Sequence, residues 1–169
     1  LDMKQFQGER YLGYYDLDTM LIVFKSTPQG WSYLRIRKDD VLSSKIQRYK
    51  DLLSTPPGGV YGSREVDEFS ELSTYLYEKL VKPALDGATR GRLAIHPDGI
   101  LLGIPFESLT TSMVRANTFK ELPYLMNRFD IRYVTTSLLT KPTYHTERAQ
   151  QAISILTCHD ATTIPEVTQ

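Results

Sequence analysis

Apolar and polar residues alternate along residues 9–38, and this pattern predicts three consecutive β-strands. The stretch "ERYLGYYDLDTMLIVFKS" is rich in Tyr, Ile, Val and Phe and is interrupted by the turn-prone "DLDT" at 16–19. "STPQG" supplies a second turn. In "WSYLRIRK" apolar and polar residues then alternate, which places Arg35 and Arg37 on the solvent-exposed face of the expected strand. We therefore expect an antiparallel three-stranded β-meander.

The next two segments show the three-to-four-residue apolar spacing of helices. In "VLSSKIQRYKDLLS", residues 41–54, the apolar side chains gather on one side, and Asp39 or Asp40 is placed to cap the first turn. "TPPGGVYGS", at 55–63, combines prolines with glycines and is expected to be a loop. A longer helix is expected over about residues 65–82, ending near Pro83.

The stretch "RLAIHPDGILLGIPFESL", residues 92–109, has the pattern of a hairpin. "RLAIH" and "ILLGI" are expected to be strands joined by the tight turn "PDG". Pro105 has no amide hydrogen for a strand ladder, so "PFESL" is not expected to continue a central strand.

Two later segments are expected to complete the sheet. Residues 129–133 alternate as a strand does, whereas "AISILTC" at 152–158 has no alternation and is typical of a strand covered on both faces. The order meander, helix, helix, hairpin, strand, strand predicts an α/β or α+β domain with a mixed sheet.

Composition narrows the class of protein without selecting a partner. The chain has 169 residues, enough for one domain with a sizeable core, and its 20 basic residues balance 20 acidic ones. There is no basic run typical of nucleic-acid binding, no apolar run near the roughly 18 residues that span a bilayer, and no apolar signal peptide. One cysteine excludes an intrachain disulfide and a multi-cysteine metal site. We expect a cytoplasmic location, no membrane partner and no direct binding of nucleic acid.

The candidate nucleophile and base residues do not form a recognisable catalytic pattern. Cys158 and His159 are adjacent, but neighbouring residues on a strand point to opposite faces, so a thiolate–imidazolium pair is not favoured. His96 ends an expected strand, and the sequence places no nucleophile where it would indicate a partner for this base. His145 lies in an expected loop. The three histidines also lack the helical spacing of a metal site.

Other suggestive residues favour structural roles. The pair Asp39-Asp40 is better placed to cap a helix than to form a catalytic dyad. Gly58, Gly59 and Gly62 are not followed by the Gly-Lys-Ser/Thr of a phosphate loop. Core packing accounts for the tyrosines better than base stacking does. The residues alone therefore assign no catalytic, cofactor-binding or metal-ligating position.

The stretch 92–109 nevertheless resembles the signature of CHAT domains, caspase-like modules often found beside tetratricopeptide repeats. The family pattern is a strand, a Pro-Asp-Gly turn, an apolar strand and Pro-Phe-Glu-x-Leu, which correspond here to 93–95, 97–99, 100–104 and 105–109. "LSTYLYEKLVKPAL" resembles the preceding helix, "YLGYYDLDTMLIVFKSTPQGWSYLRI" the initial meander, and "YLMNRFDIRYVTTSLL" the segment leading to the central sheet. With "AISILTC", which resembles the family's core strand, the matching pieces number five and together cover about residues 9–157.

The resemblance implies an α/β fold in which a caspase-like mixed sheet with flanking helices is preceded by the antiparallel meander. Residues 1–8 would be an N-terminal tail, and residues 9–169 the N-terminal portion of a CHAT-like domain. The family implies a cysteine peptidase of the caspase and separase kind, in which a histidine acts as base, a cysteine thiolate attacks the scissile carbonyl, and no cofactor is needed. Its expected partners are upstream repeat domains and a protein substrate or regulator.

This chain departs from the family at the dyad, which lies downstream of the strand that "AISILTC" resembles. No dyad residue is therefore carried onto His159, Cys158 or any other position. The expectation is an incomplete domain, which is bound to the remainder of its own protease domain, oligomeric, or stable as a compact N-terminal subdomain. Two alternatives stay open: a catalytically inactive CHAT-like interaction or scaffold module, and an unrelated enzyme that uses Cys158.

Overall fold

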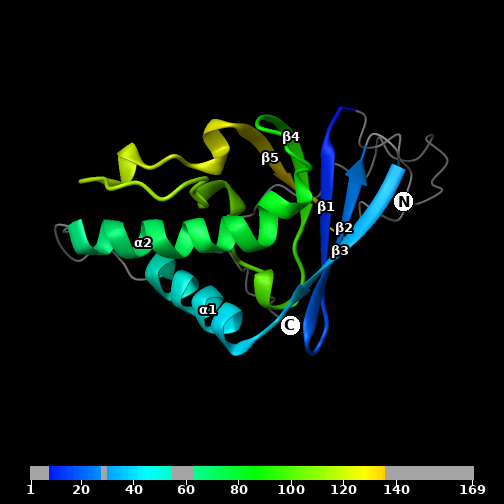
Figure 1. The fold of residues 1–169 in the computed structure, drawn as a ribbon, viewed down its shortest axis with the longest axis horizontal. Helices are drawn as coiled ribbons and strands as arrows, with labels where there is room; N and C mark the ends of the chain where they lie inside the picture. Colours follow the sequence, from blue (N-terminus) through cyan, green and yellow to red (C-terminus); the bar gives the residue numbers. More distant parts are fainter. Residues whose placement is uncertain (1–7, 28–29, 55–62, 136–169) are drawn as a thin grey trace, which may run out of the picture. The chain divides into compact units, whose positions relative to one another are not determined.

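The computed structural model describes residues 8–27, 30–54 and 63–135. The chain divides into two compact units, Leu1–Leu139 and Thr140–Gln169, and the second lies outside the described residues. The first unit contains seven main elements (Figure 1): β1 Arg10–Asp16, β2 Met20–Thr27, β3 Gly30–Arg37, α1 Asp40–Ser54, α2 Ser63–Leu76, β4 Gly91–His96 and β5 Phe129–Tyr133.

The five strands form one mixed sheet in the order β3-β2-β1-β4-β5. The pairs β1–β2 and β2–β3 are antiparallel, which confirms the meander, whereas β1–β4 and β4–β5 are parallel. The first unit is therefore a mixed α/β structure with two main helices. The strand at 129–133 is confirmed, whereas the strand expected at 152–158, most of the loop expected at 55–63 and nearly all of the tail at 1–8 lie outside the described residues.

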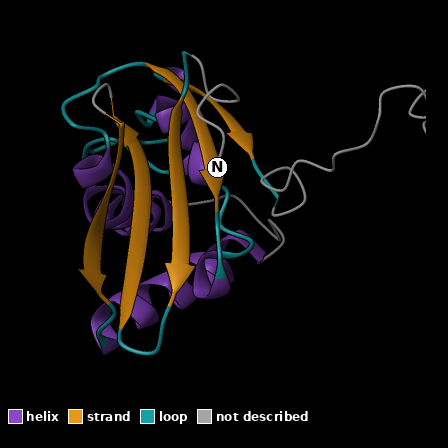
Figure 2. Cartoon of the chain, turned by 90° about the vertical axis from the view of Figure 1, so that its right-hand side faces the viewer, coloured by secondary structure: helices purple, strands orange, loops and turns teal. Residues whose placement is uncertain are grey.

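Both main helices lie against the same face of the sheet. Figure 2 shows the long strands in front and the helices behind them. The helix-facing side chains of alternate strand positions meet the buried stripes of α1 and α2, because successive strand residues point to opposite faces. The largest fully buried side chains of this core are Tyr14, Tyr49, Phe106, Leu12, Leu21, Leu42, Leu76, Leu80, Leu85, Leu93 and Ile95.

The hairpin expected at 92–104 is wrong in its second half. β4 is a strand, but residues Gly99–Leu101 form a 3₁₀ turn (η4), and β4 pairs with β1 and β5 instead of with a hairpin partner. The amide of Ile100 donates to the carboxylate of Asp16 at 2.8 Å, so a contact distant in sequence fixes this turn. Leu101 and Ile104 reach the core from the irregular backbone, and their burial gave the stretch its strand-like pattern.

The helix expected over 65–82 is confirmed in most of its length, and it changes geometry toward its end. α2 passes into a π-helical segment, Tyr77–Val81 (η2), and a 3₁₀ turn, Lys82–Ala84 (η3). Pro83 has no amide hydrogen and its ring clashes with the carbonyl of a preceding α-helical turn, which accounts for the altered turns. The Tyr14 hydroxyl donates to the carbonyl of Leu80 at 3.0 Å and thereby ties β1 to η2.

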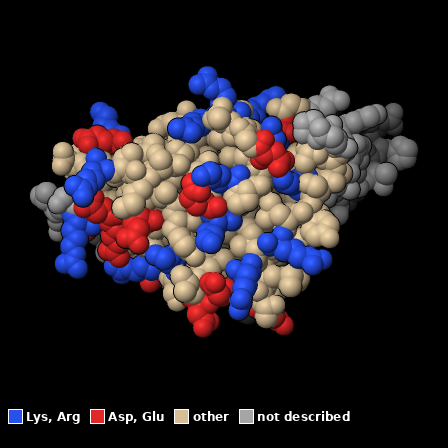
Figure 3. Space-filling model, viewed as in Figure 1, with Lys and Arg blue, Asp and Glu red and all other residues tan. Residues whose placement is uncertain are grey.

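Charged side chains of both signs are intermixed over the two main helices (Figure 3). Arg48 of α1 pairs with Glu68 of α2 at 2.7 Å, and Lys45 lies 3.4 Å from Glu71. Exposed pairs of this kind contribute little to stability, so the core determines how α1 and α2 pack. None of the helices in the described part of the chain has both the length and the apolar character needed to cross a membrane.

Candidate functional site

The carboxyl ends of β1, β4 and β5 lie at one edge of the sheet, because these three strands run parallel. Their last residues are Asp16, His96 and Tyr133. In open α/β sheets this edge is where ligands most often bind. This edge is therefore the candidate functional site.

Asp16 and Asp98 join the end of β1 to the loop after β4. The Asp16 amide donates to the Asp98 carboxylate at 3.0 Å, and the Asp16 carboxylate accepts from Ile100 and from the ammonium of Lys38. Burial alone would raise the pKa of Asp16, but the hydrogen bonds from Lys38 and Ile100 and the charge of Lys38 outweigh it and leave that pKa lowered. The carboxylate is thus held in its charged form as a structural acceptor.

Gly99 lets the loop approach Asp16 closely. Its φ is +53°, in the left-handed region, and a Cβ at this position would lie 2.2 Å from the Asp16 carboxylate oxygen. Both the conformation and the space require glycine. The "PDG" turn therefore holds the loop after β4 against the end of β1, and we call this contact the latch.

His96 is held by the backbone of the residue that follows β5, Val134. Its Nδ1 lies 2.7 Å from the carbonyl oxygen of Val134, so Nδ1 carries the proton in this hydrogen bond. Its ring lies 6.2 Å from that of Tyr15, centroid to centroid. Neither contact supplies an aliphatic hydroxyl or a thiol, and this placement suits a structural role.

The Tyr133 hydroxyl connects β5 to the "PFE" segment. It accepts the amide of Phe106 at 2.8 Å and donates to the carboxylate of Glu107. Burial, followed by the hydrogen bond to Glu107, raises the pKa of Tyr133 well above its ordinary value. Phe106 itself is fully buried against Tyr14. The "PFE" segment therefore contributes a buried ring to the core and, through Glu107, a hydrogen bond to β5.

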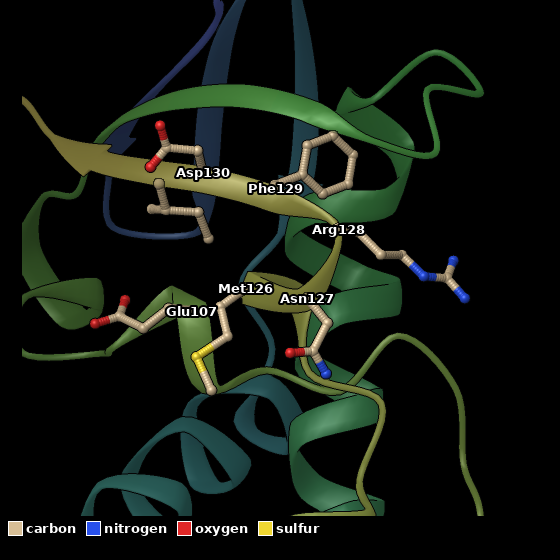
Figure 4. A pocket seen from close by; sticks show the side chains of 7 residues that line it. Glu107, Met126, Asn127, Arg128, Phe129 and Asp130 are labelled. Atoms are coloured by element: carbon tan, nitrogen blue, oxygen red, sulfur yellow. The ribbon is translucent and has the colours of Figure 1, made fainter.

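A pocket of about 490 Å³ opens beside β5. In Figure 4, Met126 and Asn127 lie across the pocket from β5, and Arg128 extends away from it. The described residues that line it are Glu107, Met126, Asn127, Arg128, Phe129, Asp130 and Ile131. None of them carries a hydroxyl, thiol or imidazole, so a nucleophile–base pair of the Ser–His or Cys–His type does not occur among them.

The other residues singled out by the sequence fall into two groups. Asp39 accepts the Leu42 amide at 2.8 Å, which confirms the helix cap, and Asp40 is the first residue of α1. His145, Cys158, His159 and the glycines 58, 59 and 62 lie outside the described residues. Within the described residues, no three His, Cys, Asp or Glu side chains are grouped as metal ligands would be.

Sequence reasoning missed the two polar joints at this edge. The Asp16 amide donates to Asp98, 82 residues away, and the Tyr133 hydroxyl accepts from the amide of Phe106, 27 residues away. The signal available was the pair of motifs "PDG" and "PFE", although neither motif indicates its partner.

No protein-family model matches this chain, and no curated protein matches it either. The fold and the edge define a mixed α/β unit whose motif residues hold strands together.

Proposed function

We propose that this chain is the N-terminal, non-catalytic part of a CHAT-type, caspase-like cysteine protease, in which it supports the fold and relays activation from repeat domains. Peptide cleavage is assigned to a His–Cys dyad of the parent protein, outside the described residues. The parent is then a cysteine endopeptidase, and the remainder of its protease domain is the first partner of this chain.

One observation supports the proposal most directly: side chains of the stretch 92–109, which resembles the family signature, hold strands of the sheet in place. Asp98 latches β1, Phe106 is buried in the core, and Glu107 clamps β5 through Tyr133. Each of these side chains stabilises the relative placement of strands, as a supporting subdomain requires. The mixed sheet with helices and an initial meander also agrees with the fold that the resemblance implies.

A second candidate is a catalytically inactive CHAT-like interaction module. It is favoured by the exposed aromatic residues on the sheet face opposite the helices, among them Tyr33, which is 55% exposed. This candidate keeps the same fold and differs only in whether the parent protein cleaves peptides.

The test uses the product of the natural gene that encodes this chain. It is incubated with a fluorogenic peptide library that varies the residue before the cleaved bond, with and without iodoacetamide. We expect thiol-dependent cleavage that survives Cys158→Ser and disappears when a cysteine downstream of this chain is replaced by Ser.

The other outcomes select among the alternatives. Absence of thiol-dependent cleavage contradicts the protease proposal and favours the interaction module. Loss of cleavage in Cys158→Ser contradicts the non-catalytic assignment and favours an enzyme that uses Cys158 itself. Alkylation of Cys158 in the wild-type chain, followed by mass spectrometry, shows whether this thiol is accessible.

A further inference from the structure

The sheet face opposite α1 and α2 carries a row of aromatic rings. We call this face of the sheet the open face. Six side chains define it: Tyr11, Tyr15, Phe24, Trp31, Tyr33 and His96. Within the described residues no helix lies over this face, as the view in Figure 2 shows.

Four of these rings form a continuous row across four neighbouring strands. From β3 to β4, the centroid distances are 6.1 Å for Tyr33–Phe24, 5.3 Å for Phe24–Tyr15 and 6.2 Å for Tyr15–His96. Tyr33 is 55% exposed and Phe24 is 39% exposed, so the row is most accessible at β3 and β2. Tyr11 and Trp31 form a second contact on this face, at 5.4 Å.

The cations on the open face of the described residues are arginines. Arg35 and Arg37 lie on β3 with Tyr33, whereas Arg92 lies on β4 and Arg132 on β5. Arg92 and Arg132 share the carboxylate of Glu9, at 4.0 and 2.7 Å. The guanidinium carbon of Arg35 instead lies 5.6 Å from the centroid of the Tyr33 ring. Neither Arg35 nor Arg37 forms an ion pair with a carboxylate of the described residues. The β3 side of the open face thus combines exposed rings with two positive charges that no carboxylate of the described ranges pairs with.

The strands that carry Phe24 and Tyr33 pair antiparallel, and such strands can leave one face to solvent. Exposed apolar side chains grouped on that face are typical of an interaction surface. Aromatic and Arg side chains are the residue types enriched in protein–protein interfaces, whereas Lys is depleted there. A helix about 10 Å across covers two to three strands at a spacing of about 4.8 Å. The row of rings is wide enough to receive one.

We propose that the open face binds an amphipathic α-helix of a protein partner, with an apolar stripe on Phe24 and Tyr33 and acidic side chains on Arg35 and Arg37. The charge complementarity selects an acidic helix. The inference rests on this surface alone and holds whether or not the parent protein is a protease.

The geometry favours a helix over single-stranded nucleic acid. Successive bases need free ring faces on which to stack. Here Phe24 packs edge to face on Tyr15, with an interplanar angle of 84°, and Arg35 already lies over the ring of Tyr33. Arg92 and Arg132 also share the single carboxylate of Glu9, which offsets one of their two charges and reduces the charge available to a phosphate backbone.

The test measures binding of a fluorescein-labelled three-heptad peptide to the full chain by fluorescence anisotropy. The peptide has Leu at heptad positions a and d and Glu at e and g, and the Glu residues discourage its own dimerisation. A matched peptide has Lys in place of Glu. We expect the wild-type chain to bind the acidic peptide and to bind the basic one at least about ten-fold more weakly, with an affinity for the acidic peptide that falls as salt is added.

The variants locate the binding surface. Tyr33→Ala and Phe24→Ala are each expected to weaken binding about ten-fold, as exposed interface anchors do. Arg35→Glu is expected to weaken binding of the acidic peptide and to strengthen binding of the basic one. Met113→Ala, at a side chain 65% exposed away from the sheet, and Arg115→Glu, on the same loop, are the matched controls and are expected to leave binding unchanged.

Several results overturn the proposal. These are no binding of the acidic peptide, equal binding of both peptides, or binding that Tyr33→Ala does not affect. Tighter binding of a twelve-nucleotide oligothymidylate that depends on Tyr33 assigns the face to nucleic acid instead. Self-association in sedimentation velocity that Tyr33→Ala abolishes assigns it to a second copy of this chain.

Discussion

Gly99 is the residue at which an unusual backbone conformation and a distant contact coincide. Gly99→Ala is expected to lower the free energy of unfolding by about 2–4 kcal/mol, because it adds left-handed strain and a clash with the Asp16 carboxylate. Gly103 is the matched control: its φ is +81°, but beyond its chain neighbours no atom lies within 4 Å of the place that a Cβ would take. Gly103→Ala is therefore expected to cost only the strain, about 1 kcal/mol. Equal losses in urea unfolding would contradict the latch.

Asp16 should make the stability of the fold depend on pH. Its pKa is lowered in the folded state, so its stabilisation is complete above the unfolded pKa and is lost as pH falls through the folded pKa. Asp16→Asn is expected to be about 1–3 kcal/mol less stable than wild type at pH 7, and the difference should shrink in acid. Urea unfolding at several pH values measures it, with Asp67→Asn, at an exposed position on α2, as control. A difference that stays constant with pH would contradict this role.

At the scale of elements, the hydroxyl of Tyr133 joins β5 to the 3₁₀ turn Phe106–Ser108 (η5). Tyr133→Phe removes the acceptor of the Phe106 amide and is expected to cost about 1–2 kcal/mol and to speed hydrogen exchange at that amide. Thermal unfolding and amide exchange by NMR measure the two effects. Tyr33→Phe, on the open face, is the control and is expected to change neither. Unchanged exchange at Phe106 would show that this joint does not hold η5.

The elements that depend on local pattern were predictable from the sequence, and those that depend on distant contacts were not. The meander and the cap at Asp39 follow from alternation and from one short-range hydrogen bond. The turn at Gly99–Leu101 is decided by Asp16, 84 residues from the amide of Ile100, and no local propensity encodes that contact. The parallel pairing of β1 with β4 is likewise non-local, so the edge that brings Asp16, His96 and Tyr133 together was beyond sequence reasoning.

At the scale of the whole described unit, the two faces of the sheet differ in how completely they are buried. The helix face holds Phe106 at 0% exposure, whereas the open face holds Phe24 at 39%. The same replacement, Phe to Ala, made at Phe106 and at Phe24, therefore measures how much each face contributes to the free energy of unfolding. The comparison separates a face that already belongs to the folded core from one that is still available to a partner.

Phe106→Ala is expected to cost about 3–5 kcal/mol, because it leaves a cavity where Phe106 packs on Tyr14. Phe24→Ala is expected to cost about 1–2 kcal/mol, since it loses ring contacts with Tyr15 and Tyr33 but less buried area than Phe106→Ala does. Urea unfolding of the full chain measures both. If Phe24→Ala proves as costly as Phe106→Ala, then the open face is already part of a packed core in the full chain. A helical partner would then have no exposed surface to bind. Equal costs would therefore contradict the proposal that the open face binds a helix.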